Sequence, residues 1–295
     1  MRTIKVKFAA LFCILFFCLI LASCATKPTV VQSRQINQVR LDRVLRGGSC
    51  FNYFVDMKVD DQIIKARLDT GATLSIIPDV EPFHSFPAVK TVNLSGAGGA
   101  VKNALVVHAK KIMIGSQTLV LQDVVLHSSK TFKFATLGAN SLRDQLVILD
   151  LGHGQMYFNG PEQKGNFPKL DLGKDGRMMI EVSMNQQRYR TMIDTGSCVT
   201  QVDKSIIKDR PEDFSLVRTD KVRDLFGNRF EARIYRVKEF KFPGFVIRDA
   251  LVTEADLSND SKSLGESISV VLGANFMSMA KWYLDFKEKK WGVSL

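Results

Sequence analysis

A series of short motifs occurs twice in this sequence in the same order, and the duplication favours folds built from two similar halves. Asp69-Thr70-Gly71 and Asp194-Thr195-Gly196 both end apolar runs, at an offset of 125 residues. Further along, Leu137-Gly138-Ala139-Asn140 returns as Leu272-Gly273-Ala274-Asn275, at an offset of 135 residues. Solenoid repeats span about 20–45 residues. The much longer unit here therefore predicts two homologous lobes.

The flanks of the two aspartates predict the same local structure. Each aspartate follows an alternating strand, a polar turn at Asp60-Asp61 or Asn185-Gln186, and a second strand. The larger downstream offset predicts an insertion in the second half, and the polar stretch 256–263 is its expected site, as a loop. Short helices are expected at 205–208 and after each Leu-Gly-Ala-Asn.

Composition favours a β-rich globular chain. Of the 295 residues, 45% are hydrophobic and 24% are charged, which is enough to bury a core. Short apolar runs with frequent Gly, Asn and Asp are typical of strands and turns. The length suits one bilobal protein or two small domains.

Residues 1–23 are predicted to be a signal peptide outside the fold. Arg2, Lys5 and Lys7 precede an apolar run over 8–22, shorter than the roughly 20 residues that span a bilayer. The run ends in Leu21-Ala22-Ser23-Cys24, which resembles a bacterial lipobox. This resemblance implies cleavage before Cys24 and lipidation of its thiol. An uncleaved anchor and a plain secretory signal are the alternatives.

Ala25 resembles an outer-membrane sorting signal, so we expect a lipid-anchored protein of the bacterial cell envelope that faces the periplasm. Residues 24–46 are expected to be a tether, with a possible strand near 39–45. The lobes are then expected at 47–165 and 166–295. Removal of the signal lowers the net charge from +11 to about +8, which we interpret as ordinary surface charge. The sequence shows no nucleic-acid motif.

Neither the cysteines nor the histidines predict a catalytic thiol or a metal site. Cys50 and Cys198 remain after processing; they can pair in an oxidising periplasm, but we expect two separate buried thiols. The four histidines all lie in the first half and lack metal-ligand spacing. We expect no metal and no cofactor.

Over roughly residues 48–295 the chain resembles the aspartic protease superfamily. Asp69-Thr70-Gly71-Ala72 is similar to the retropepsin site, and Asp194-Thr195-Gly196-Ser197 is similar to the pepsin site. The resemblance implies a mostly β protein, with two retropepsin-like β-barrel lobes in one bilobal pepsin-like fold and a cleft between them. It also implies that Asp69 and Asp194 are the catalytic dyad.

The same resemblance assigns roles to the neighbours of the dyad. Thr70 and Thr195 would exchange hydrogen bonds between the two loops, while Gly71 and Gly196 allow tight backbone there. Leu137-Gly138 and Leu272-Gly273 would support the loops from beneath.

Two glycine-containing segments are candidate flaps that close over a substrate. Gly96, Ala97, Gly98 and Gly99 lie between two predicted strands, and Phe226-Gly227 occupies the matching place in the second half. Plain hairpin turns are the alternative for both. Pepsin-type enzymes carry a tyrosine in the first flap, and this sequence has none between Asp69 and Leu137.

The chemistry of paired carboxylates supports the dyad independently. Two adjacent carboxylates share one proton, so one can take a proton from water while the other donates one to a carbonyl. The Ser197 hydroxyl is able to donate to Asp194, and Ala72 has no such group. We therefore expect Asp194 to be the charged partner and Asp69 the proton carrier. Replacement of Ser197 by alanine would then raise the acidic limb of the pH–rate profile.

Three hypotheses for the function remain open. The first is a membrane-tethered, monomeric aspartic endopeptidase that cleaves extended peptides or proteins with Asp69 and Asp194. The second is a catalytically inactive lipoprotein that uses the same fold to bind peptides or to regulate. The third is a pair of unrelated β domains in which the Asp-Thr-Gly copies are only turns.

Overall fold

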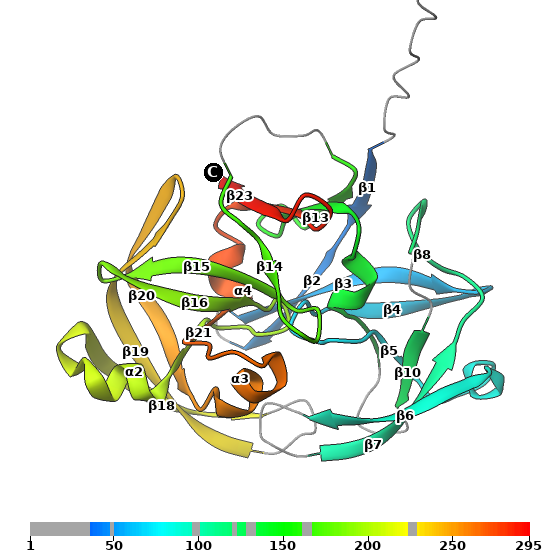
Figure 1. The fold of residues 1–295 in the computed structure, drawn as a ribbon, viewed down its shortest axis with the longest axis horizontal. Helices are drawn as coiled ribbons and strands as arrows, with labels where there is room; N and C mark the ends of the chain where they lie inside the picture. The colour runs from blue at the N-terminus through cyan, green and yellow to red at the C-terminus, as the bar shows by residue number, and fades with distance from the viewer. Residues whose placement is uncertain are drawn as a thin grey trace, which may run out of the picture. The chain divides into compact units, whose positions relative to one another are not determined.

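The computed structural model describes residues 36–47, 50–95, 101–119, 123–127, 134–160, 167–223 and 229–295. These residues belong to one compact unit, Gln35–Leu295, built mostly of β-strands (Figure 1). Within the described ranges no helix has the length and hydropathy needed to cross a membrane.

Matched hairpins deliver the two aspartates. In the first half β3 (Cys50–Val59) pairs with β4 (Gln62–Leu68), and in the second half β15 (Met178–Met184) pairs with β16 (Gln187–Ile193) (Figure 1). The turns have positive φ angles, 50° at Asp60 and 45° at Asn185, a conformation that Asp and Asn tolerate better than most residues. The predicted hairpins are thereby confirmed.

The other strands of each half extend these hairpins into a sheet. Those of the first half are β2 (Asp42–Gly47), β5 (Ile76–Pro78), β6 (Ala88–Ser95), β7 (Val101–His108), β8 (Ile112–Ile114), β9 (Gln117–Thr118), β10 (Asp123–His127) and β11 (Ala135–Leu137). Those of the second half are β14 (Asp171–Leu172), β17 (Gln201–Asp203), β18 (Phe214–Arg223), β19 (Arg229–Phe242), β20 (Phe245–Ala255) and β21 (Val270–Leu272).

The two sheets repeat one topology. The strand order is β6-β7-β10-β5-β11-β4-β3-β8-β9 in the first half and β14-β15-β16-β21-β17-β20-β19-β18 in the second. In the second half β19 also pairs with β15, which closes the sheet into a barrel. In the first half the strand β8 makes the equivalent pairing with β3. There β7 and β8 are two separate strands, whereas β19 is a single long strand. The predicted class, mostly β with two barrel-like lobes, is confirmed.

A third sheet joins the halves. It has the order β1-β13-β12-β22-β23, formed by β1 (Asn37–Arg40), β12 (Leu146–Asp150), β13 (Gln155–Phe158), β22 (Lys281–Asp285) and β23 (Lys290–Ser294). Its centre pairs β12 with β22, so that Leu149 lies opposite Trp282. The stretch expected to contain one strand near 39–45 forms two, β1 and β2, which are separated by Leu41.

One hydrophobic core continues from half to half. Buried side chains of β3, β4, β16, β21 and β22 belong to the same cluster. At its centre Trp282 and Trp291 stack with their ring centroids 5.9 Å apart. Burial of a large apolar side chain stabilises a fold by about 1.5–3 kcal/mol. This shared core therefore helps to hold the two halves together.

The short helices agree with the sequence at three places and differ at one. Helix α2 (Lys204–Asp209) lies where it was expected. The 3₁₀ turn η2 (Ala139–Leu142) and α4 (Ala274–Met277) begin at the alanine of each Leu-Gly-Ala-Asn, two residues before the expected start. Two further turns are η1 (Phe83–Ser85) and η3 (Pro211–Asp213). The stretch predicted to be a polar loop contains helix α3 (Ser258–Leu264), so that prediction was wrong.

Helix α3 forms because its polar sequence still presents one apolar side to the protein. Leu257 and Leu264, seven residues apart, lie on one face. Both are buried against Met179, Met192 and Val271.

Candidate active site

Each aspartate lies at the end of a buried strand and is held by a neighbouring parallel strand. The Asp69 amide donates to Leu137 O at 3.0 Å, and the Asp194 amide donates to Leu272 O at 3.0 Å. Strands β4 and β16 pair in parallel with β11 and β21 at these positions. The repeated Leu-Gly segments therefore support the aspartate loops, as the resemblance implied.

The expected exchange of hydrogen bonds between Thr70 and Thr195 is present and fully buried. The Thr70 amide donates to Thr195 Oγ1 at 3.1 Å, and the Thr195 amide donates to Thr70 Oγ1 at 3.0 Å. Each hydroxyl then donates to the backbone of the opposite half, Thr70 to Ile193 O and Thr195 to Leu68 O, both at 3.0 Å. Four bonds thus fix one aspartate loop against the other.

The glycines bring each carboxylate against the opposite loop. A Cβ atom on Gly71 would collide with the Asp194 carboxyl group, and a Cβ atom on Gly196 would collide with that of Asp69. The carboxyl group of Asp69 also acts on that of Asp194 electrostatically. The aspartates are therefore neighbours, which contradicts the hypothesis of two unrelated structural turns.

Sequence reasoning missed a pair of polar supports beneath the loops. Asn140 Oδ1 accepts from the amide and hydroxyl of Ser75, at 2.8 and 3.0 Å. Asn275 Oδ1 does the same for Thr200, at 2.8 and 2.9 Å. Both asparagines belong to the repeated Leu-Gly-Ala-Asn, and Ser75 and Thr200 differ by the same 125 residues as the aspartates. That offset was the signal that could have found them.

The pKa of Asp194 shifts in the direction opposite to the prediction, in which Asp194 was the charged partner. Burial of the carboxyl group and the adjacent charge of Asp69 raise the pKa of Asp194 to about 7. Arg67 Nη2 donates to Asp69 Oδ2, and only 13% of the arginine side chain and 11% of the aspartate side chain are exposed. The guanidinium of Arg67 therefore places a positive charge beside Asp69.

The hydroxyl of Ser197 does not act as predicted. It donates to Val199 O at 2.9 Å and accepts from Gln201 Nε2 at 2.9 Å. Asp194 Oδ1 accepts instead from the backbone amides of Gly196 and Ser197, at 2.8 and 3.2 Å. On the other side, Asp69 Oδ1 accepts from the Ala72 amide at 3.1 Å. Because backbone amides serve both carboxylates, the Ala72/Ser197 difference does not set their charges.

Several predicted site residues lie outside the described residues. These are the flap candidates Gly96, Ala97, Gly98, Gly99, Phe226 and Gly227, and the lipidation candidate Cys24. Cys198, four residues after Asp194, is disulfide-bonded, so the expectation of a free thiol there was wrong. The side chain of Cys50, the partner that the sequence offers, also lies outside the described residues.

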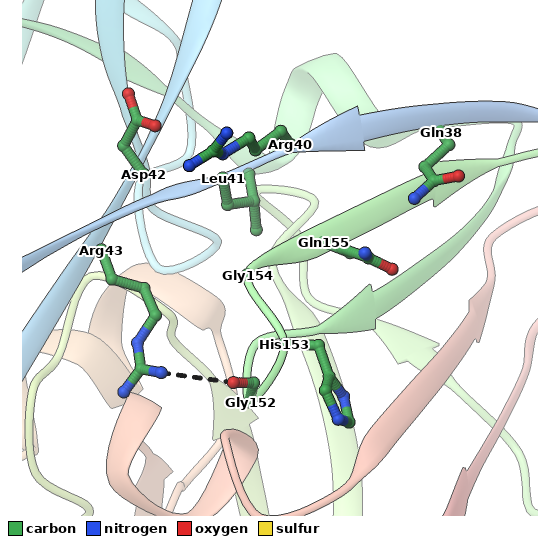
Figure 2. A pocket seen from close by; sticks show the side chains of 9 residues that line it. All are labelled: Gln38, Arg40, Leu41, Asp42, Arg43, Gly152, His153, Gly154 and Gln155. Atoms are coloured by element: carbon green, nitrogen blue, oxygen red, sulfur yellow. Dashed lines mark hydrogen bonds between the residues drawn. The ribbon is translucent and has the colours of Figure 1, made fainter.

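A cavity of about 640 Å³ lies apart from these residues, where β1 and β2 meet the turn between β12 and β13 (Figure 2). Its lining includes Arg40, Arg43 and His153. Arg43 donates to Gly152 O at 3.3 Å and also stacks over the ring of Phe51. The guanidinium of Arg43 therefore ties the N-terminal strands to the fold, and none of the predicted site residues lines this cavity. The described residues contain no group of three or more potential metal ligands.

The two halves of the chain match different family models. Residues 52–149 match a family model described as retroviral aspartyl protease, and residues 180–276 match one described as aspartyl protease. No curated protein matches the chain. Each matched stretch contains one aspartate, its Thr-Gly neighbours and the Leu-Gly that supports its loop.

Proposed function

Because this chain belongs to the retropepsin-like aspartic proteases, we propose that it is an active endopeptidase that hydrolyses extended peptides with Asp69 and Asp194. The observation that carries the proposal is the reciprocal bonding of Thr70 and Thr195, with each carboxyl group against the opposite glycine. Each half supplies half of the constellation, and neither half can form it alone.

The chemistry follows from the closeness of the carboxyl groups. In aspartic proteases such a pair keeps one proton between them, because two ionised carboxylates at this separation repel strongly. The ionised carboxylate accepts a proton from water, whose oxygen bonds to the carbonyl carbon of the peptide. The protonated carboxyl group donates its proton to the carbonyl oxygen. No covalent intermediate with the protein is required.

Apolar surface beside the Asp69 loop supports a preference for apolar side chains near the cleaved bond. Ile76, Val106 and Val125 form a small cluster, against which the partly exposed Leu74 and Leu94 pack. Leu74 lies on the same loop as Asp69. A peptide bound in an extended conformation would be held by main-chain hydrogen bonds, with its side chains received by such apolar surface.

We further propose that the enzyme is attached to the bacterial envelope through a lipidated Cys24. The lipobox-like sequence that ends at Cys24 supports this part of the proposal. Stable attachment needs more than one acyl chain, which lipoprotein processing provides.

The test is cleavage of a peptide library between pH 4 and 7, with and without pepstatin, by a soluble chain that begins after Cys24. We expect pepstatin-sensitive cleavage that Asp69→Asn and Asp194→Asn each abolish. Asp61→Asn is the matched control, because its fully exposed side chain lies on the hairpin turn far along β4 from Asp69. Peptide binding without cleavage would instead support the inactive, peptide-binding lipoprotein.

A further inference from the structure

The two halves differ in charge at the position two residues before each aspartate. In the first half this residue is Arg67, and in the second half it is Met192, at the same offset of 125 residues. Alternate residues of a strand point to the same face, so Arg67 and Asp69 share a face, as do Met192 and Asp194. Arg67 uses this placement to form its partly buried ion pair with Asp69.

The described strand neighbours of Arg67 carry no second charge that competes with it. Its neighbours across β3 and β11 are Phe54 and Thr136, neither of which ionises in this range of pH. Within the described part of the chain, Asp69 and Arg67 are the charged groups that influence Asp194.

On the opposite side the strand presents no free cation to Asp194. Met192 is buried beneath Leu257 and Leu264 of the α3 segment. Arg190 lies on the same face one step further back, and it is bound to Asp171 and Glu266. Among the described residues of these two strands, β4 therefore supplies a counter-ion to the dyad and β16 supplies none.

We propose that Arg67 is the positioning residue that keeps the negative charge of the dyad on Asp69 and leaves the proton on Asp194. The hydrogen bonds fit this distribution. Both oxygens of Asp69 accept, Oδ2 from Arg67 and Oδ1 from the Ala72 amide, as a carboxylate should.

The inference rests on the proposed function, and it assigns each proton transfer of peptide hydrolysis to one of the two aspartates. Asp69 takes a proton from the water as the water oxygen bonds to the carbonyl carbon, and Asp194 gives its proton to the carbonyl oxygen. When the resulting diol breaks down, the proton on Asp69 passes to the amine nitrogen as the C–N bond breaks. A diol hydroxyl returns a proton to Asp194, so the dyad ends as it began.

The first experiment compares the pH dependence of kcat/KM for the unmodified protein, Arg67→Met and Arg67→Lys. Arg67→Met copies the residue of the second half, so it removes the charge and retains a long apolar side chain. We expect its acidic limb to rise by roughly 1–2 pH units, because an adjacent cation lowers a carboxyl pKa by about that amount. Arg67→Lys keeps the charge, so its acidic limb should stay close to that of the unmodified protein.

Two further variants test whether the acidic limb of kcat/KM responds specifically to the charge at position 67. Arg188→Met removes an arginine whose side chain is 84% exposed at the β15–β16 hairpin, and we expect it to leave the limb in place. Ser197→Ala is also expected to leave the limb in place, because its hydroxyl donates to Val199. A limb that moves with Ser197→Ala and not with Arg67→Met would overturn the inference.

The second experiment observes the carboxyl groups without turnover. A ¹³C-aspartate NMR titration of the unmodified protein, assigned with Asp69→Asn and Asp194→Asn, should show Asp194 protonated and Asp69 ionised at about pH 5. This result would support the inference even in a protein that cleaves nothing, which separates it from the proposed function. The opposite assignment would overturn the inference and leave the proposed function intact. Because this measurement uses the native residue at position 67, it does not depend on the folding of the Arg67 variants.

Discussion

At the scale of single residues, the buried carboxyl group of Asp194 links stability to pH. Burial raises the pKa of Asp194 to about 7, well above its ordinary value of 3.8. A group that binds its proton more tightly in the folded state stabilises the fold fully below the unfolded pKa. That contribution is lost as pH rises through the folded pKa. The native protein should therefore lose stability between about pH 4 and 7 from this group.

Asp194→Asn provides the test at this scale. Asparagine has similar shape and no charge, so the variant should lack the loss of stability on going from pH 4 to pH 8. We expect its Tm to exceed that of the native protein by several degrees at pH 8, and to differ little at pH 4. Thermal unfolding at both pH values measures this, and a gain of equal size at both values would refute the linkage.

The contact between Arg67 and Asp69 also shows what the sequence does and does not contain. Arg67 precedes Asp69 by two residues, so the alternation of a strand was sufficient to predict that they face the same way. The hydroxyl of Ser197 was different, because its direction depends on Val199 O and Gln201 Nε2, which become neighbours only in the folded loop. The first contact is local in sequence and strand geometry fixes it, whereas the second depends on a side-chain rotamer.

At the scale of elements, helix α3 is the insertion that distinguishes the second half. Its sequence is polar and reads as a loop, since only Leu257 and Leu264 mark the buried face. Ion pairs attach it to the lobe, because Arg177 is buried and binds both Asp175 and Asp260. The sequence could not show this attachment, since Arg177 and Asp260 are far apart along the chain.

Leu264→Ala should destabilise the protein by about 2–4 kcal/mol, because the side chain is 1% exposed and its loss leaves a cavity over Met192. Leu216→Ala is the matched control, since Leu216 is 58% exposed on β18 and its loss should have little effect. Urea denaturation of the two variants gives the comparison. Equal effects would mean that α3 does not pack on the lobe as described.

At the scale of the whole molecule, the joining of the halves has a kinetic consequence. The β12–β22 pairing and the continuous core connect the two halves within one chain. Each half contributes one aspartate, and we expect both to stay in place at any protein concentration. Activity per molecule should therefore be constant on dilution from micromolar to nanomolar enzyme, measured as initial rate against concentration. A rate that falls with the square of concentration would show that two chains are needed.

This level of structure was the most predictable from the sequence. The 125- and 135-residue offsets predicted two lobes and placed the hairpins, the aspartates and the supporting Leu-Gly segments in register. The β12–β22 sheet was not predicted, because the two strands lie far apart and their apolar runs do not specify a partner. Alternating apolar residues indicate where strands lie, but the pairing of distant strands depends on how their side chains pack in the folded protein.

The duplication carried by one chain also explains how a lone arginine can act at a two-fold site. In an enzyme assembled from two identical copies, any residue placed beside one aspartate appears beside the other as well. A mutation there would add two cations or none, and the carboxyl groups would stay equivalent. Two linked copies can change independently, so an arginine can occupy position 67 while a methionine, Met192, occupies the equivalent position of the other half. The doubled sequence thus lets this fold assign different tasks to two residues that began as the same one.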